Sequence, residues 1–61
     1  MGVYTQHDRE RITAIAEHLL AGEVKGRRVD PQDEAAMEIA MRRCVREAAT
    51  IYNSALEYVS G

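Results

Sequence analysis

Apolar residues in the first third of the chain recur every three or four positions, which is the pattern of an amphipathic helix. They are Ile12, Ile15, Ala16, Leu19 and Leu20. At about 100° per residue, this spacing places them on one stripe of a helix. Thr5 and Asp8 form the Thr-x-x-acid arrangement of a helix start, in which the Thr5 side chain accepts a hydrogen bond from the backbone three residues on. Because Gly22 favours a helix end, we predict a first helix over residues 6–21.

The next segment has the composition of a loop and is followed by a strong helix-start signal. Residues 22–30 show no hydrophobic period and combine glycines with charged residues. Asp30 and Pro31 then match the N-cap and the first position of a helix. No further glycine or proline occurs before Gly61. We therefore predict a loop over 22–30 and a second, longer helix over 31–59.

The apolar positions of the second helix alternate in steps of four and three, which is the heptad pattern of helices that pack along their length. They are Met37, Met41, Cys44, Ala48, Ile51, Ala55 and Tyr58, and Val45, Tyr52, Leu56 and Val59 widen the same face. We call the first seven residues the seam. The predicted fold class is all-α: an antiparallel two-helix hairpin with a short first and a long second helix, forming a single domain over residues 1–61.

The two helices differ in length, and this difference predicts a surface for association. A first helix of about sixteen residues covers only about two-thirds of the second, so the last apolar residues keep no partner except Val3 and Tyr4. An exposed apolar stripe of that length is typical of a binding site. We expect a second copy of the chain to cover it, giving a homodimeric four-helix bundle, or else another protein. The predicted interface residues are Met37, Met41, Cys44, Ala48, Ile51, Tyr52, Ala55, Leu56, Tyr58 and Val59.

The composition favours association over independent folding. A domain of 61 residues buries a smaller share of its surface than a larger domain does, and it is only marginally stable by itself. Its one cysteine permits neither an internal disulfide nor a cysteine zinc cage. No apolar run approaches the ~20 residues of a membrane span, and the first residues lack the apolar core of a signal peptide. We therefore expect a cytoplasmic protein that does not contact a membrane.

Residues that carry chemistry in other proteins have structural explanations here. Cys44 lies on the seam, where a free cysteine packs as a small apolar residue. His7 and His18 share one side of the first helix but lie about 16 Å apart, which is too far to share a metal ion. The glutamates of the second helix form no Glu-x-x-His pair of the kind found in di-iron bundles. We therefore predict that the protein is not an enzyme and holds no cofactor and no metal.

Two groups of basic residues suggest an alternative function. They are Lys25, Arg27 and Arg28 in the predicted loop, and Arg42, Arg43 and Arg46 on the outer face of the second helix. Doubled in a dimer, they would suit a small nucleic-acid-binding regulator. Against this, the net charge is −2, glutamates lie among the arginines, and no aromatic residue is interleaved for base stacking.

The function that the sequence favours is a non-enzymatic helical interaction protein, which regulates or scaffolds a protein partner. Its first alternative is nucleic-acid binding, and its second is an accessory subunit of an enzyme. The seam of the second helix is the predicted interface of the interaction protein, and the two basic groups are the predicted contacts for nucleic-acid binding.

Overall fold

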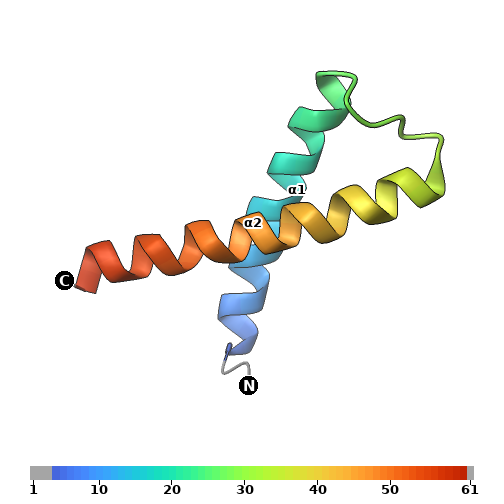
Figure 1. Ribbon diagram of the computed structural model, residues 1–61. Helices are drawn as coiled ribbons and strands as arrows, with labels where there is room; N and C mark the ends of the chain where they lie inside the picture. Colours follow the sequence, from blue (N-terminus) through green and yellow to red (C-terminus); the bar gives the residue numbers. More distant parts are fainter. Residues whose placement is uncertain (1–3, 61) are drawn as a thin grey trace.

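The computed structural model describes residues 4–60, which form two α-helices joined by a loop. Helix α1 spans Gln6–Lys25 and helix α2 spans Glu34–Ser60, with no strand among the described residues (Figure 1). The predicted all-α class, with a shorter first and a longer second helix, is confirmed. The predicted contact of Val3 with the second helix lies outside the described residues.

The start of α1 follows the local sequence. The backbone amide of Asp8 donates to the Thr5 side chain at 3.1 Å, and the Thr5 amide donates to Asp8 Oδ2 at 3.0 Å. These two bonds form a capping box, in which each residue satisfies a backbone group that the first helical turn leaves free. The predicted start of the first helix at Gln6 is therefore confirmed.

The end of α1 lies one turn later than predicted. The helix continues through Gly22 to Lys25, and the prediction of an end at residue 21 is wrong. The chain leaves the helix at Arg27, which has a φ of 60°, while the Arg28 amide donates back to the Glu23 carbonyl at 2.9 Å. This is the hydrogen-bonding pattern of a Schellman motif, with an arginine in the left-handed position that glycine usually takes. A glycine within a helix lowers its stability by only about 1 kcal/mol relative to alanine, and the contacts of the last turn offset this loss.

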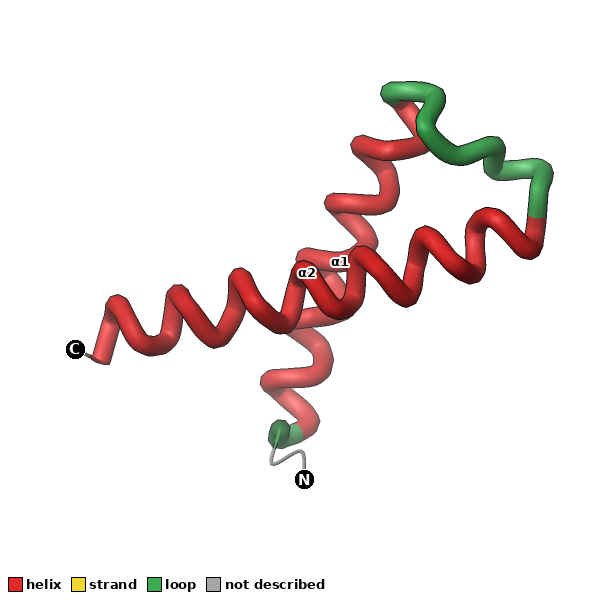
Figure 2. Tube along the Cα trace, in the orientation of Figure 1, coloured by secondary structure: helices red, strands yellow, loops and turns green. Residues whose placement is uncertain are grey.

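The start of α2 also differs from the prediction, by three residues. Asp30 and Pro31 open a turn instead of a helix, because the Asp33 amide donates to the Asp30 carbonyl at 3.0 Å. The Asp33 side chain in turn accepts from the Ala36 amide at 3.1 Å, and α2 begins at Glu34. The same Asp-Pro pair suits both a helix start and the first half of a turn. The connecting loop therefore covers 26–33 (Figure 2).

The core lies where the two helices cross. Its buried residues are Ile12, Ala16 and Leu20 of α1 and Ala40, Cys44 and Ala48 of α2. On both helices these residues are four positions apart. Rows of this kind interlock at a steep angle of about 50°, whereas heptad seams interlock at about 20°. Figure 1 accordingly shows α1 and α2 crossing, in contrast to the side-by-side hairpin that the heptad pattern predicts.

Because the helices cross, α1 covers only the middle of α2. The molecule measures 40 × 22 × 15 Å along its principal axes, so it is long and thin. Ala40 takes a place in the core that the seam prediction did not assign to it, at 1% exposure. Helix α2 extends past the crossing in both directions, where its apolar face is half-buried at Met37, Met41 and Tyr52 and exposed at Leu56 and Val59.

Candidate interaction surface

The ten residues predicted for an interface fall into three environments. Cys44 and Ala48 are buried against α1, Met37, Met41 and Tyr52 are half-buried, and Ile51, Ala55, Leu56, Tyr58 and Val59 are exposed. The buried pair belongs to the core of the single chain and is not free to contact a partner. The exposed group lies on the last three turns of α2, which we call the α2 arm (residues 51–60).

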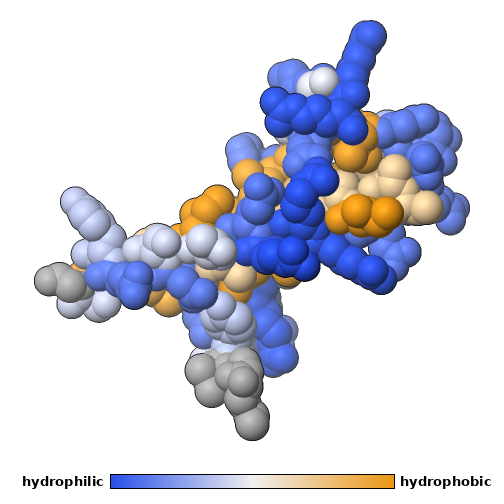
Figure 3. Space-filling model, in the orientation of Figure 1, coloured by the Kyte–Doolittle hydropathy of each residue, from blue (hydrophilic) through white to orange (hydrophobic). Residues whose placement is uncertain are grey.

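The α2 arm exposes large apolar side chains. The exposed fraction is 48% for Ile51 and Leu56, 82% for Val59 and 89% for Tyr58. In Figure 3, apolar side chains emerge on both edges of this part of the helix. Single exposed apolar residues are common on proteins, but several on one short helical segment are typical of a binding site.

A second apolar feature lies on the other side of the crossing. It is a groove of about 520 Å³ between the second half of α1, the loop and the first turns of α2. Its lining consists of Glu17, Leu20, Ala21, Val24, Lys25, Pro31, Met37 and Met41. We call it the Met groove. Its two charged members are exposed, and methionine side chains adapt easily to the shape of an apolar ligand. The sequence pattern did not indicate this groove, because it depends on how α1, α2 and the loop meet.

A polar contact joins the base of the α2 arm to the start of α1. The Tyr52 hydroxyl donates to Asp8 Oδ1 at 2.5 Å, and Asn53 Nδ2 donates to the Tyr4 hydroxyl at 2.8 Å. The hydrogen bond from Tyr52, followed by that from the Thr5 amide, lowers the pKa of Asp8 below its ordinary value of 3.8. The same bond raises the pKa of Tyr52 above its ordinary value of 10.0. The contact is therefore strongest with Tyr52 protonated and Asp8 ionised.

This contact predicts a stability profile that falls at both ends of the pH range. The lowered pKa of Asp8 stabilises the folded state above about pH 3.8, and this contribution is lost as acid protonates the carboxylate. The raised pKa of Tyr52 stabilises the folded state below about pH 10, and this contribution is lost in stronger alkali. Near neutral pH, Tyr52→Phe should unfold at a lower temperature than the wild type. Its unfolding midpoint should also fall less than that of the wild type in acid and in alkali.

The matched control for that experiment is Tyr58→Phe. Tyr58 is 89% exposed in the single chain and phenylalanine keeps its apolar ring, so removal of the hydroxyl should leave the pH profile of the wild type unchanged. A Tyr52→Phe profile that coincides with that of the wild type would show that the bond to Asp8 does not contribute to stability.

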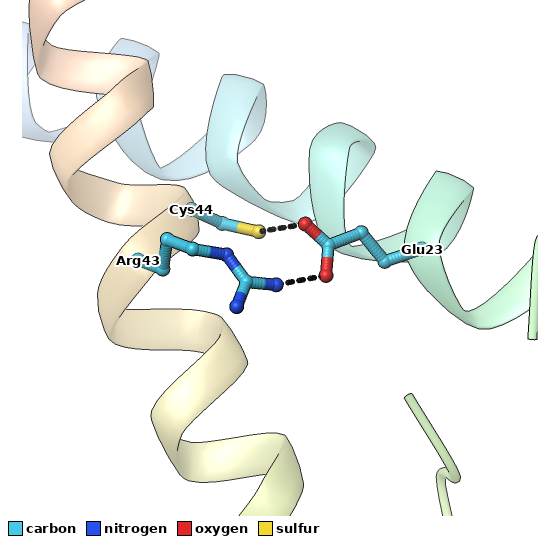
Figure 4. A network of polar contacts seen from close by, with 3 residues as sticks. All are labelled: Glu23, Arg43 and Cys44. Atoms are coloured by element: carbon cyan, nitrogen blue, oxygen red, sulfur yellow. Dashed lines mark hydrogen bonds and ion pairs between the residues drawn. The ribbon is translucent and has the colours of Figure 1, made fainter. Parts of the chain in front are cut away.

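Three polar residues meet where the last turn of α1 approaches the first half of α2. The Arg43 guanidinium forms an ion pair with Glu23, and the Cys44 thiol donates to Glu23 Oε2 at 3.9 Å (Figure 4). Burial, assisted by the negative charge of Glu23, raises the pKa of the Cys44 thiol. The thiol therefore stays protonated near neutral pH and packs as a small core residue, because reactivity requires a thiolate and access to solvent.

Glu23 and Cys44 also form part of a group of metal-ligand types. Each of Glu23, Cys44 and Glu47 places one donor atom within 4.8 Å of the other two. Thiolate and carboxylate are zinc ligands, and the sequence offered no signal for this group because its members come from two helices. However, Arg43 already supplies the positive charge beside Glu23. We assign the group to the stability of the crossing.

Three of the six basic residues predicted as nucleic-acid contacts, Arg28, Arg42 and Arg43, lie beside glutamates. Arg42 pairs with Glu38 at 2.6 Å, and Arg43 pairs with Glu23. Arg28 lines a hollow together with His18, Glu23 and Glu47, and Arg46 lies beside Ile39, Arg42 and Arg43 on the outer face of α2. Lys25 ends α1 and Arg27 occupies the turn that follows. An exposed ion pair contributes little to stability, but it lowers the local positive potential that attracts phosphate.

Comparison of the chain with protein families, with curated proteins and with solved structures found no match. Among the described residues, neither helix combines the length and the apolar character that a membrane crossing requires.

Proposed function

We propose that this protein is a non-enzymatic helical interaction module, which self-associates through the apolar surface of α2 and in that form regulates or scaffolds a protein partner. The observation that carries the proposal is the α2 arm, where Tyr58 and Val59 are more than four-fifths exposed. An apolar arm of this kind is stabilised when another helix covers it. A cytoplasmic setting suits the single free thiol of Cys44, since a reducing compartment keeps it unpaired.

The small size of the core supports obligate association. Three of its six buried residues are alanines and one is a cysteine, so little apolar area is buried where α1 and α2 cross. Burial of large apolar side chains is the main favourable contribution to folding. We infer that association supplies the burial that the single chain lacks, and that folding and self-association are coupled.

The direct test of self-association is the dependence of thermal unfolding on protein concentration. If folding requires a dimer, a hundredfold rise in concentration adds about 2.7 kcal/mol to the stability of the dimer and raises the unfolding midpoint. Sedimentation equilibrium on the same samples should give twice the mass of one chain. A folded monomer with a midpoint that does not depend on concentration would overturn the proposal.

The same sedimentation experiment separates this proposal from nucleic-acid binding. Binding through phosphate contacts is strongest at low salt and weakens steeply as salt rises. Because Arg42 and Arg43 are already paired with glutamates, we expect short duplex DNA or RNA added at low salt to sediment separately from the protein. Co-sedimentation that disappears at higher salt would favour the nucleic-acid alternative.

A further inference from the structure

Helix α2 carries a second apolar stripe beside its buried row. It consists of Met41, Val45, Ala49, Tyr52, Leu56 and Val59, in steps of four, four, three, four and three. This spacing keeps the six residues on one side of the helix. Val45 follows Cys44 directly and is therefore turned about 100° from the row that contacts α1. Accordingly, Val45 is 43% and Leu56 48% exposed, whereas Met41, Ala49 and Tyr52 are half-buried beside the core.

The stripe continues into the Met groove. Met41 belongs to both, so one apolar surface extends from the groove, past Ala49, to Val59 on the α2 arm. None of the six stripe residues carries a charge. The groove at one end is hollow, and Val59 at the other end is 82% exposed. Antiparallel pairing of two copies would bring the hollow end of one stripe to the exposed end of the other.

The total exposed area indicates how much of the surface an occupant would cover. A compact monomer of 6.8 kDa exposes about 4,000 Å² by the usual scaling of area with mass. This chain exposes 5076 Å², which is roughly 1,100 Å² more. A standard protein interface buries about 800 Å² on each partner. The excess exposed area of this chain is thus similar to the area that each partner buries in one stable dimer interface.

We propose that a second copy of this chain covers the stripe, with the two α2 helices antiparallel, Val59 of each copy lying at the Met groove of the other, and Leu56 lying against Val45. This inference rests on the proposed self-association and adds the surface, the direction and the register. The two-fold axis passes near residue 50.

The order of residues along the stripe selects the antiparallel direction. An axis near residue 50 places Met41 opposite Val59 and Val45 opposite Leu56. It also places Ala49 opposite Tyr52, so that the smallest side chain of the stripe meets the largest. In a parallel pair, each residue would face its own copy, which leaves a void between the alanines and crowds the two tyrosines. Interfaces pack as densely as protein interiors, so the antiparallel order is favoured.

Cysteine crosslinking tests this register with two single variants, Val45→Cys and Leu56→Cys. In the proposed dimer these positions face each other between copies, whereas each lies about 16 Å along the helix from its own counterpart. A disulfide requires Cα atoms within about 7 Å. The two variants are unfolded together, refolded and oxidised, and the products are analysed by mass spectrometry. We expect disulfide-linked dimers that contain one chain of each variant, and none when either variant is oxidised alone.

The wild type is the control, because Cys44 is fully buried and should stay unlinked. Self-linked dimers of each variant would overturn the antiparallel direction. Absence of any link from a sample that sediments as a dimer would overturn the register while leaving self-association intact. Samples that sediment as folded monomers would overturn both the register and the proposed function.

Discussion

Replacement of Leu56 by lysine is expected to weaken self-association by roughly a hundredfold or more. The Leu56 side chain is about half exposed in the single chain, so the lysine costs the crossing of α1 and α2 little. In the dimer it would lie against the other copy, where an ammonium group loses water without gaining a partner. Loss of a central apolar contact costs about 2 kcal/mol or more, and each dimer contains the substitution twice. Sedimentation equilibrium over a range of protein concentrations measures the change in Kd.

The matched control for this variant is Ile39→Lys. Ile39 is 62% exposed and lies on the outer face of α2 beside the arginines, away from the stripe. The same change from an apolar residue to lysine should therefore leave the Kd within a fewfold of the wild-type value. If Ile39→Lys weakened association as strongly as Leu56→Lys, the interface would not be confined to the stripe and the arm.

Replacement of Ala48 by aspartate is expected to unfold the chain at every concentration. Ala48 has no exposed surface and lies in the buried row of α2 that contacts α1. An aspartate there would bury a carboxylate with no partner at the crossing and would force the two helices apart. Effects of this kind exceed about 4 kcal/mol, which is comparable to the whole stability of a domain this small. Far-UV circular dichroism should show loss of most of the helical signal.

Ala14→Asp provides the matched control, because Ala14 lies on the exposed side of α1. The same substitution there should reduce stability by less than about 1 kcal/mol, the difference in helix propensity. The effects of Leu56→Lys and Ala48→Asp should differ in their dependence on protein concentration. Higher concentration should restore the helical signal of Leu56→Lys, because its defect is in association. It should not restore the helical signal of Ala48→Asp. Retention of a wild-type helical signal in Ala48→Asp would contradict the observed core.

The helix ends show where local sequence is sufficient and where it is not. The start of α1 was predictable because Thr5 and Asp8 satisfy each other's backbone groups within one helical turn. The bond from Tyr52 to the other Asp8 oxygen adds to this cap but is not needed to form it. The end of α1 was not predictable from Gly22, since a full turn follows that places Glu23 against Arg43 of α2. The Asp30-Pro31 pair is compatible with two local structures, and the path of the loop selects the turn.

The candidate surface was predictable in part. The apolar residues of the α2 arm follow from the spacing along the sequence, whereas their exposure results from the crossing of the helices and not from the length of α1. The Met groove, the bond between Tyr52 and Asp8, and the group around Cys44 did not follow, because each joins residues that are distant in the chain.

The sequence by itself determined that the protein is two helices, the longer one apolar along one face. These properties depend on hydrogen bonds and side-chain spacing within a few residues. Only the tertiary structure decided which part of that face lies inside the chain. The small residues Ala40, Cys44 and Ala48 allow rows four apart to interlock with Ile12, Ala16 and Leu20, which sets a steep crossing instead of a heptad seam. Because two crossed helices can cover each other only near their crossing point, the α2 arm remains exposed.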